Sequence, residues 1–258
     1  SRSGIPESGL PRCADALRQC PLIALEGVCT HFSLADEDLL LLPGAHNTTA
    51  TQLDVLLSCV QRLRASGYFA RYVHAANSAA TFGLFASHLD LVRTGIALYG
   101  ISPFNKAHTT RASDLRPVLR WGARVEAVRQ VKTGQAVGYG ASFTASQDSV
   151  IATIPVGYAD GYPLHWSTQP QVVIKGMRCP VVGRVCMDLM MVDVTPPVNN
   201  ASFSVAVDDT AWLIGGEPLS NNESVVNYIS AAELAKFADV IPYAILANIS
   251  NRVPRRPE

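Results

Sequence analysis

Several features that mark familiar classes of protein are missing from this chain of 258 residues. Charged residues make up only 16% of it, and 21 basic residues balance 21 acidic ones. Because a protein held on nucleic acid by charge needs an excess of lysine and arginine, the composition argues against a nucleic-acid partner. No apolar window approaches the roughly 20 residues of a membrane-spanning helix, so we expect no membrane partner either.

The spacings that bind metals or form dense disulfide frameworks are missing as well. The six cysteines contain no C-x-x-C pair, so we expect reduced thiols in a cytoplasmic protein. The six histidines show neither H-x-x-x-H nor H-E-x-x-H spacing, so we expect no zinc site on a helix and no metal.

An initiator methionine, a signal peptide and a transit peptide are not seen, since the chain opens at Ser1 with S-R-S-G-I-P. This opening is typical of the middle of a domain. We therefore expect the chain to be a fragment of a longer protein.

The sequence that is present changes in character near residues 105–117. Before this point, helix-like and strand-like segments alternate, which favours βαβ units on a parallel sheet. Thr49 and Gln52 fit a capping box at the start of the clearest helix. The expected helices cover 10–19 and 49–65, and the expected strands cover 22–31, 70–75 and 90–98.

After this point, short β-rich runs are separated by turns of glycine, proline and asparagine, which indicates an antiparallel β-domain. Ser230 and Glu233 fit a capping box before a closing helix. The expected β-rich runs are 117–131, 149–156, 171–175, 179–186, 190–194 and 209–214.

The two regions together predict an α/β plus all-β fold. A complete (β/α)8 barrel takes about 250 residues, so residues 1–112 are expected to form the C-terminal half of one. Residues 113–258 are expected to form the antiparallel β-domain. Half a barrel leaves sheet edges open and a core uncovered, which is a second reason to expect further sequence upstream.

Polar residues follow the expected strands of the first region. Asn77 and Ser78 in H-A-A-N-S-A-A either hold a phosphate or form an ordinary turn and helix cap. Arg93 lies in an apolar stretch and needs a partner, and Gly95 would let backbone N–H groups approach an anion. A structural salt bridge with a glycine bend is the alternative. His31 ends a strand as a catalyst or as a hydrogen-bonded structural residue.

Two motifs stand out in the second region. Tyr158 in G-Y-A-D-G either acts as an acid or base or packs over a tight turn. Because a tyrosine pKa lies near ~10, the first role requires nearby cations. In G-R-V-C-M-D, Cys186 has no identifiable base beside it and reads as a small buried residue, while Met187 and Asp188 have core and turn interpretations.

In chain order, seven motifs resemble alanine racemase, a fold-type III pyridoxal phosphate enzyme. The resemblance runs over nearly the whole chain and implies a barrel followed by a β-domain, pyridoxal 5'-phosphate as cofactor and a homodimer with shared active sites. The motifs are HFSLADE, HAANSAA, VRTGIALYG, VGYGASF, IPVGYADGYP, VVGRVCMD and SNRVPR.

The resemblance implies how protons are moved. A racemase takes an α-proton from one face and returns it to the other, so Tyr158 would serve one face, in the partner's site, and a lysine the other. The cofactor is the electron sink. Arg93 would face its pyridine nitrogen and, being permanently charged, would leave that nitrogen unprotonated. His31 would join the network of Tyr158 and Arg93, and through this link Arg93 would favour the phenolate of Tyr158.

The resemblance also implies how the cofactor phosphate is held. Asn77 and Ser78 match the family's A-N-S motif, in which the serine binds the phosphate. Gly95 and Ile96 would add backbone N–H groups.

The substrate carboxylate is expected between two further residues. Arg2, in R-S-G, matches the family's carboxylate-binding arginine, and Met187 would contribute its backbone N–H across the dimer. Asn251 stands where many members have a tyrosine that touches the phosphate. The smaller, polar asparagine predicts a pocket that admits serine as well as alanine.

The lysine that anchors the cofactor in this family lies in an A-x-x-K-A-N-A-Y-G-like stretch that is missing here. The resemblance implies racemisation of L-alanine to D-alanine for peptidoglycan, but this chain is expected to be inactive on its own. An amino-acid decarboxylase and a non-catalytic remnant of a split gene remain alternatives. The four lysines present are Lys106, Lys132, Lys175 and Lys236.

Overall fold

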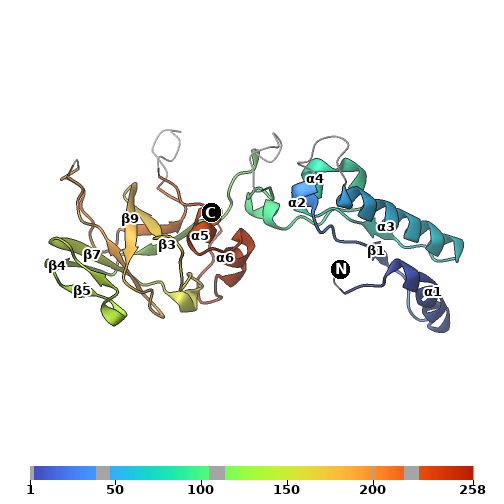
Figure 1. Cartoon of the computed structure of the whole chain (residues 1–258), viewed down its shortest axis with the longest axis horizontal. Helices are drawn as coiled ribbons and strands as arrows, with labels where there is room; N and C mark the ends of the chain where they lie inside the picture. The colour runs from blue at the N-terminus through green and yellow to red at the C-terminus, as the bar shows by residue number, and fades with distance from the viewer. Residues whose placement is uncertain (1–2, 39–46, 105–113, 199, 218–226, 258) are drawn as a thin grey trace. The chain divides into compact units, whose positions relative to one another are not determined.

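The computed structural model describes residues 3–38, 47–104, 114–198, 200–217 and 227–257. It divides into two compact units, Ser1–Arg116 and Pro117–Glu258, and each is described here by itself (Figure 1). The division falls four residues after the predicted one, which was placed between 112 and 113.

The first unit is built on two short parallel strands connected through a long helix. β1 and β2 pair in parallel, with Val28 opposite Val73. Parallel neighbours need a crossover connection, and α3 supplies it. The elements are η1 (Glu7–Gly9), α1 (Leu10–Gln19), β1 (Gly27–Cys29), α2 (Ala35–Asp38), α3 (Thr48–Ala65), β2 (Tyr72–His74), α4 (Ser78–Gly83), η2 (Phe85–Ser87) and η3 (Ile96–Tyr99).

The start of α3 differs from the predicted capping box. The cap is Asn47, whose side-chain oxygen accepts a hydrogen bond from the Ala50 N–H at 2.8 Å. Thr49 instead donates its N–H and its hydroxyl to the buried carboxylate of Asp38. Gln52 accepts from the Ser33 N–H at 3.0 Å. The capping prediction was wrong because the side chains of Thr49 and Gln52 form hydrogen bonds with residues outside the helix.

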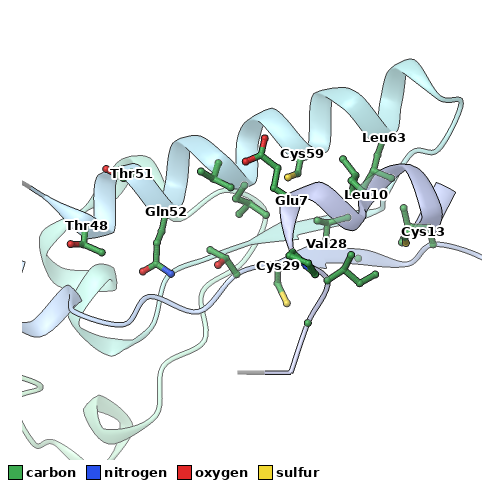
Figure 2. A pocket seen from close by; sticks show the side chains of 18 residues that line it. Glu7, Leu10, Cys13, Val28, Cys29, Thr48, Thr51, Gln52, Cys59 and Leu63 are labelled. Atoms are coloured by element: carbon green, nitrogen blue, oxygen red, sulfur yellow. The ribbon is translucent and has the colours of Figure 1, made fainter. Parts of the chain in front are cut away.

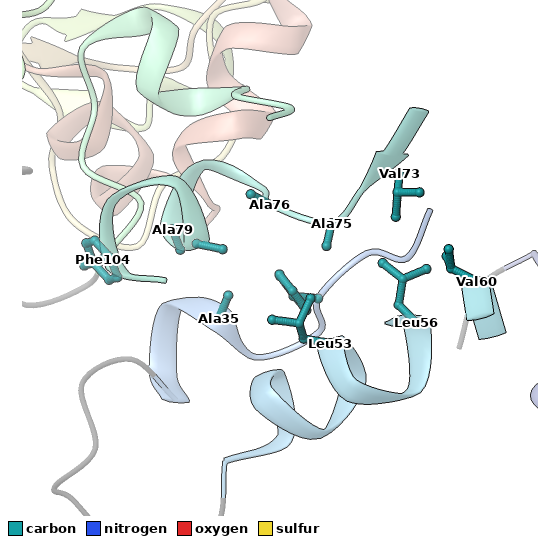
Figure 3. Close-up of a cluster of buried hydrophobic side chains, with 11 residues drawn as sticks. Ala35, Leu53, Leu56, Val60, Val73, Ala75, Ala76, Ala79 and Phe104 are labelled. Carbon is teal, nitrogen blue, oxygen red and sulfur yellow. The ribbon is translucent and has the colours of Figure 1, made fainter. Parts of the chain in front are cut away.

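The core of the first unit lies between α3 and the strand β2. Figure 3 shows Leu53, Leu56 and Val60 of α3 directed toward Val73 and the residues that follow it. These leucines and the valine recur at helical spacing, which is why one face of α3 is buried. Small side chains fill the rest of the cluster, chiefly Ala35, Ala75, Ala76, Ala79 and Ala80.

Residues 90–98, predicted as a strand, are not one in the structure. This segment makes two backbone hydrogen bonds to the β2 region, from Asp90 to Val73 and from Arg93 to Ala76, and then turns into η3. The carboxylate of Asp90 accepts the Val73 N–H at 2.7 Å. Since a side chain already holds that N–H, it is not available to a backbone ladder.

The second unit is a seven-stranded antiparallel sheet in the order β3-β11-β8-β9-β10-β7-β4, with a separate hairpin of β5 and β6. The strands are β3 (Trp121–Arg124), β4 (Ala127–Val131), β5 (Ala136–Val137), β6 (Phe143–Thr144), β7 (Ser149–Ile154), β8 (Gln171–Ile174), β9 (Met177–Val182), β10 (Met190–Asp193) and β11 (Thr210–Ile214). Antiparallel pairing throughout agrees with the short runs and turns of the sequence.

The predicted run 117–131 is two strands that lie at opposite ends of this sheet order. At the junction, the Val125 N–H donates to Asp209 O at 2.8 Å, and the Glu126 N–H donates to Thr153 O at 2.9 Å. The chain therefore bonds to both ends of the sheet within two residues. This requires the sheet to curl until its ends approach each other.

Large aliphatic side chains fill the core of the second unit. Ile154, Ile174, Met190, Leu213 and Leu234 are fully buried. Two helices follow the sheet, α5 (Ala231–Phe237) and α6 (Pro242–Asn248). Ser230 accepts the Glu233 N–H at 3.0 Å, so α5 begins at the predicted cap.

Candidate active site

Ser78 and the backbone N–H groups that converge on its hydroxyl form a cluster in the first unit, called the cradle below. Its hydroxyl oxygen accepts the Gly95 N–H at 2.9 Å and the Ala97 N–H at 3.4 Å. The side chain is buried at the start of α4. The structure thus brings together Ser78 and Gly95 as predicted from sequence, and adds Ala97 beside the predicted Ile96.

The cradle is open toward Gly95. A Cβ atom placed on Gly95 would meet no atom within 4 Å, so there is open space beside the Cα atom of Gly95. The N–H groups of Gly95 and Ala97 converge on the Ser78 oxygen, and the Ser78 O–H can donate to a ligand. Hydroxyl and backbone N–H groups are the donors that bind phosphate oxygens. The chemistry of this donor set therefore fits the phosphate of pyridoxal phosphate.

Asn77 caps the helix that carries Ser78. Its side-chain oxygen accepts the Ala80 N–H at 3.1 Å, and its carbonyl accepts the Thr81 hydroxyl at 2.8 Å. This is the turn-and-cap role, one of the two roles that the sequence allows for Asn77. Its effect is to fix the first turn of α4, and with it the hydroxyl of Ser78.

Arg93 is held by three partners at the ends of the two strands. Its guanidinium donates to Thr30 O at 2.7 Å and to Ala75 O at 3.1 Å, and it contacts the Nδ1 atom of His74. The half-buried arginine therefore has partners for its polar hydrogens, as a partly desolvated charge requires. Within the described part of the chain, they are carbonyls and an imidazole instead of the carboxylate of a salt bridge.

His74 contacts Arg93 and therefore joins the candidate site. It opens the motif H-A-A-N-S-A-A, but it was not predicted from the sequence as a site residue. Burial lowers the pKa of His74, and the neighbouring Arg93 cation lowers it further. A neutral imidazole can accept a hydrogen bond from the guanidinium at Nδ1, whereas an imidazolium cannot. The signal in the sequence was its position at the end of a strand, the same signal that singled out His31.

His31 follows β1 and lies next to Thr30, the residue whose carbonyl binds Arg93. Its own carbonyl accepts from the Gln52 side chain at 3.5 Å. The membership of His31 in a network with Arg93 and Tyr158 stays a prediction.

In the second unit, Tyr158 and Met187 lie on two turns that bond to each other. The Tyr158 N–H donates to Cys186 O at 3.1 Å, and the Ala159 N–H donates to Met187 O at 3.0 Å. Both predicted side chains are accessible, Tyr158 at 42% and Met187 at 54% exposure. A Cβ atom on Gly157 would lie 2.3 Å from the carbonyl oxygens of Cys186 and Met187, so only glycine permits this approach.

The segment that carries Asn251 passes along the same turn. The Ser250 N–H donates to Asp160 O at 2.9 Å. Gly161 has a φ of +99°, and a Cβ there would lie 2.0 Å from Asn248 O. Asn251 is exposed directly after this contact. Three motifs that are far apart in the sequence therefore meet at one place in the β-domain.

The remaining predicted residues and lysines are placed as follows. Arg2 and Lys106 lie outside the described residues. Lys132 pairs with Asp148 at 2.7 Å, and Lys175 pairs with Asp209 at 2.9 Å. Lys236 lies in α5.

A pocket of about 520 Å³ opens elsewhere in the first unit, between α1, β1 and α3 (Figure 2). Glu7, Cys29 and Cys59 are among its lining residues. Ser78 and Arg93 do not line it, so we do not assign it to the cradle.

Two features are not found among the residues that the structure describes. No three histidine, cysteine or acidic side chains group there as ligands for a metal ion. No helix among those residues has the length and apolar character needed to cross a membrane.

The first unit has two parallel strands with the Ser78 cradle after them, and an antiparallel β-domain with an exposed tyrosine follows it in the sequence. These features define a barrel-plus-β-domain protein. The family models agree with this class. "Alanine racemase, N-terminal domain" matches residues 1–103, and "Alanine racemase, C-terminal domain" matches residues 118–257. The chain belongs to the alanine racemase family, and its fold is the C-terminal half of a (β/α)8 barrel followed by the β-domain.

Curated relatives and solved structures cover the same span. The chain is 38% identical over 254 residues to the alanine racemase of Geobacter sulfurreducens, covering 98% of this chain and 62% of that protein. The structure of alanine racemase from a D-cycloserine-producing Streptomyces lavendulae is similar with a TM-score of 0.83 and 30% identity, covering 99% of this chain and 63% of that one. Alanine racemase from Bacillus anthracis with bound L-Ala-P gives 0.82 and 32%, covering 98% and 60%. The chain thus spans about three fifths of these relatives.

Proposed function

We propose that this chain supplies the C-terminal part of a pyridoxal phosphate-dependent enzyme that interconverts L-alanine and D-alanine. The observation that carries the proposal is the pair of backbone hydrogen bonds between the turn of Tyr158 and the turn of Met187, two neighbouring turns whose side chains are both accessible. The relatives are named alanine racemase, which supports alanine as the substrate.

The cradle of the first unit is proposed to hold the cofactor. Ser78 and the N–H groups of Gly95 and Ile96 would bind its phosphate, which requires the Gly95 N–H to exchange the Ser78 oxygen for a phosphate oxygen, and Arg93 would face its pyridine nitrogen. When bound, pyridoxal phosphate supplies an electron sink that makes the α-proton of an amino acid acidic. Arg93 is fixed by Thr30, His74 and Ala75, so its guanidinium would be held in one place there.

The β-domain is proposed to transfer the α-proton and to bind the substrate carboxylate. The phenol oxygen of Tyr158 would take or return the α-proton on one face. The N–H group of Met187 would orient the carboxylate, together with Arg2. We propose that these residues serve the partner's cofactor in a homodimer, as the resemblance implies. His31 would favour the phenolate by linking Tyr158 to Arg93.

The second face requires a proton acceptor that this chain does not contain in the family's motif. Lys132 and Lys175 are already paired with carboxylates of the β-domain. We therefore expect no racemisation by the 258-residue chain with added cofactor. The first part of the barrel, with its lysine, must come from elsewhere in the protein or from another chain.

A complementation experiment tests the proposal. The chain would be mixed with the N-terminal part of the Geobacter sulfurreducens relative that it does not cover, together with pyridoxal phosphate and L-alanine. We expect D-alanine only from the mixture. Replacing Tyr158→Phe in the chain should lower kcat about a hundredfold or more, because it removes a general acid/base.

The controls separate the alternatives. Tyr139→Phe removes another exposed phenol of the same domain and should leave the rate unchanged. Carbon dioxide release from a basic amino acid would identify a decarboxylase. Assembly of the mixture without turnover of any amino acid would favour a non-catalytic remnant and would contradict the proposal.

Asn251 bears on the substrate specificity. It is exposed beside the turn of Tyr158, where a polar amide and a lost ring leave room for a hydroxyl. We propose that serine is accepted along with alanine. The ratio of kcat/KM for the two amino acids in the complemented enzyme decides this, and a large preference for alanine would contradict it.

A further inference from the structure

Arg252 lies between two carboxylates that belong to two different motifs. Its guanidinium NH2 group donates to Asp188 Oδ1 at 2.8 Å, and its Nε atom lies 3.6 Å from Asp160 Oδ1. Asp188 directly follows Met187, and Asp160 ends the short helix η6 (Tyr158–Asp160). One side chain therefore joins the turn of Met187 to the turn of Tyr158.

Asp160 is the inner partner of this arrangement. Its side chain is 13% exposed, against 53% for Arg252 and 57% for Asp188. Its Oδ2 atom accepts the Gly157 N–H at 2.9 Å, and its carbonyl accepts the Ser250 N–H at 2.9 Å. The carboxylate thus fixes the backbone before Tyr158 while its other oxygen faces Arg252.

The backbone at this place cannot adjust easily. Glycine is required at Gly157 and Gly161 because neighbouring carbonyl oxygens lie within 2.3 and 2.0 Å of a Cβ position. A small displacement of one turn would therefore be transmitted to the next. Without Arg252, the two carboxylates would face each other with no cation between them, and their repulsion would push the turns apart.

We propose that Arg252 is a positioning residue that holds the turn of Tyr158 in register with the turn of Met187. The catalytic meaning of this register rests on the proposed function, but the contact itself does not. Arginine can contact both carboxylates because its planar guanidinium carries N–H groups on separate nitrogen atoms. The single ammonium of lysine cannot contact both carboxylates in this way.

Amide hydrogen exchange of the 258-residue chain tests the proposal without any turnover. The reporters are the N–H groups of Tyr158 and Ala159, which bond to the other turn. In Arg252→Gln, we expect both to exchange about fivefold faster, as expected when a local ion pair is lost. Arg252→Lys should give an intermediate rate, because the cation remains but bridges only one acid at a time.

Matched variants separate a local from a general effect. Arg124→Gln removes another exposed arginine of the same domain, which pairs with Asp208 at 3.5 Å, and should leave both reporters unchanged. Asp188→Asn should speed exchange at Ala159 while Ser250 stays protected by the carbonyl of Asp160. In the unmodified chain, raising salt to about 1 M should speed the reporters by screening the ion pairs, whereas Arg252→Gln should not respond.

Two outcomes would overturn the proposal. Exchange at Tyr158 and Ala159 that is the same in Arg252→Gln as in the unmodified chain would show that the guanidinium does not hold the turns. Faster exchange throughout the sheet, including Thr153 and Met191, would show a general loss of stability instead of positioning. Failure of the complementation experiment would leave these exchange rates unaffected, so the two proposals fail separately.

Discussion

The two units position their candidate site residues by different kinds of contact. In the first unit, the hydroxyl of Ser78 accepts N–H groups from a segment 17 residues further along, and the open side of the cradle is free space over Gly95. In the second unit, backbone carbonyls and N–H groups of distant turns meet directly, and Gly157 and Gly161 permit the approach. In the first unit, the arrangement therefore depends on one side chain, that of Ser78. In the second unit, the position of Tyr158 depends on the path of the backbone.

The cores differ in the same direction. Alanines surround the leucines of α3 in the first unit, so few large side chains hold its two short strands. The curled sheet of the second unit buries isoleucine, leucine, valine and methionine from most of its strands. We therefore expect the second unit to be the more stable of the two.

The largest effect is expected where backbone meets backbone. In Gly161→Ala, the new methyl would lie 2.0 Å from Asn248 O, so the β-domain should lose about 4 kcal/mol or more of unfolding free energy. Gly134→Ala is the control, because Gly134 also has a positive φ of +84° but meets no atom within 4 Å. It should cost about 1 kcal/mol from backbone strain. Urea unfolding measures both, and equal costs would contradict the close-approach explanation.

Large-to-small substitutions compare the two cores. Leu213→Ala in the second unit should cost about 3 kcal/mol, and Leu53→Ala in the first about 2 kcal/mol, since Leu53 is slightly exposed and lies among small side chains. All three tryptophans, Trp121, Trp166 and Trp212, lie in the second unit. Tryptophan fluorescence should therefore report Leu213→Ala but not Leu53→Ala, whose loss should appear in far-UV circular dichroism. A fluorescence transition shifted by Leu53→Ala would show that the units unfold together.

Removing the Ser78 hydroxyl should have a moderate, local effect. In Ser78→Ala, the N–H groups of Gly95 and Ala97 lose their acceptor, at a cost of about 1 kcal/mol in local stability. Exchange of the Gly95 amide should speed up accordingly. Ser87→Ala is the matched control, because it removes a buried hydroxyl that donates to Leu84 O instead. If the Gly95 amide exchanged at the same rate in Ser78→Ala as in the unmodified chain, the hydrogen bond that defines the cradle would be contradicted.

The smallest effect is a pH dependence confined to the first unit. Burial and the Arg93 cation hold the pKa of His74 below its usual 6.5. The unfolded chain therefore binds this proton more readily than the folded one, so the stabilising contribution is complete above pH 6.5 and is lost as the pH falls below it. NMR titration of the imidazole should show a midpoint below 6.5, and His74→Gln should remove this part of the pH dependence. A midpoint at or above 6.5 would contradict the arrangement.

Local features were predicted well and tertiary ones poorly. The helix over 49–65 was predicted because its leucines recur at helical spacing, and the structure has it at Thr48–Ala65. The cap was wrong because Asp38 binds Thr49, a contact between segments that no local pattern shows. The strand over 90–98 was wrong because Asp90 holds the Val73 N–H with its side chain.

The sequence by itself determined the order of the motifs and the resemblance to the family, because residue identity and spacing along the chain carry this information. The tertiary structure decided which residues meet. It set Arg93 against His74 and Thr30, the latter 63 residues away, and it set Arg252 between Asp160 and Asp188, the latter 64 residues away. The physical reason is that these contacts depend on where the strands end and how the sheet curls, and neither is written in any short stretch of sequence.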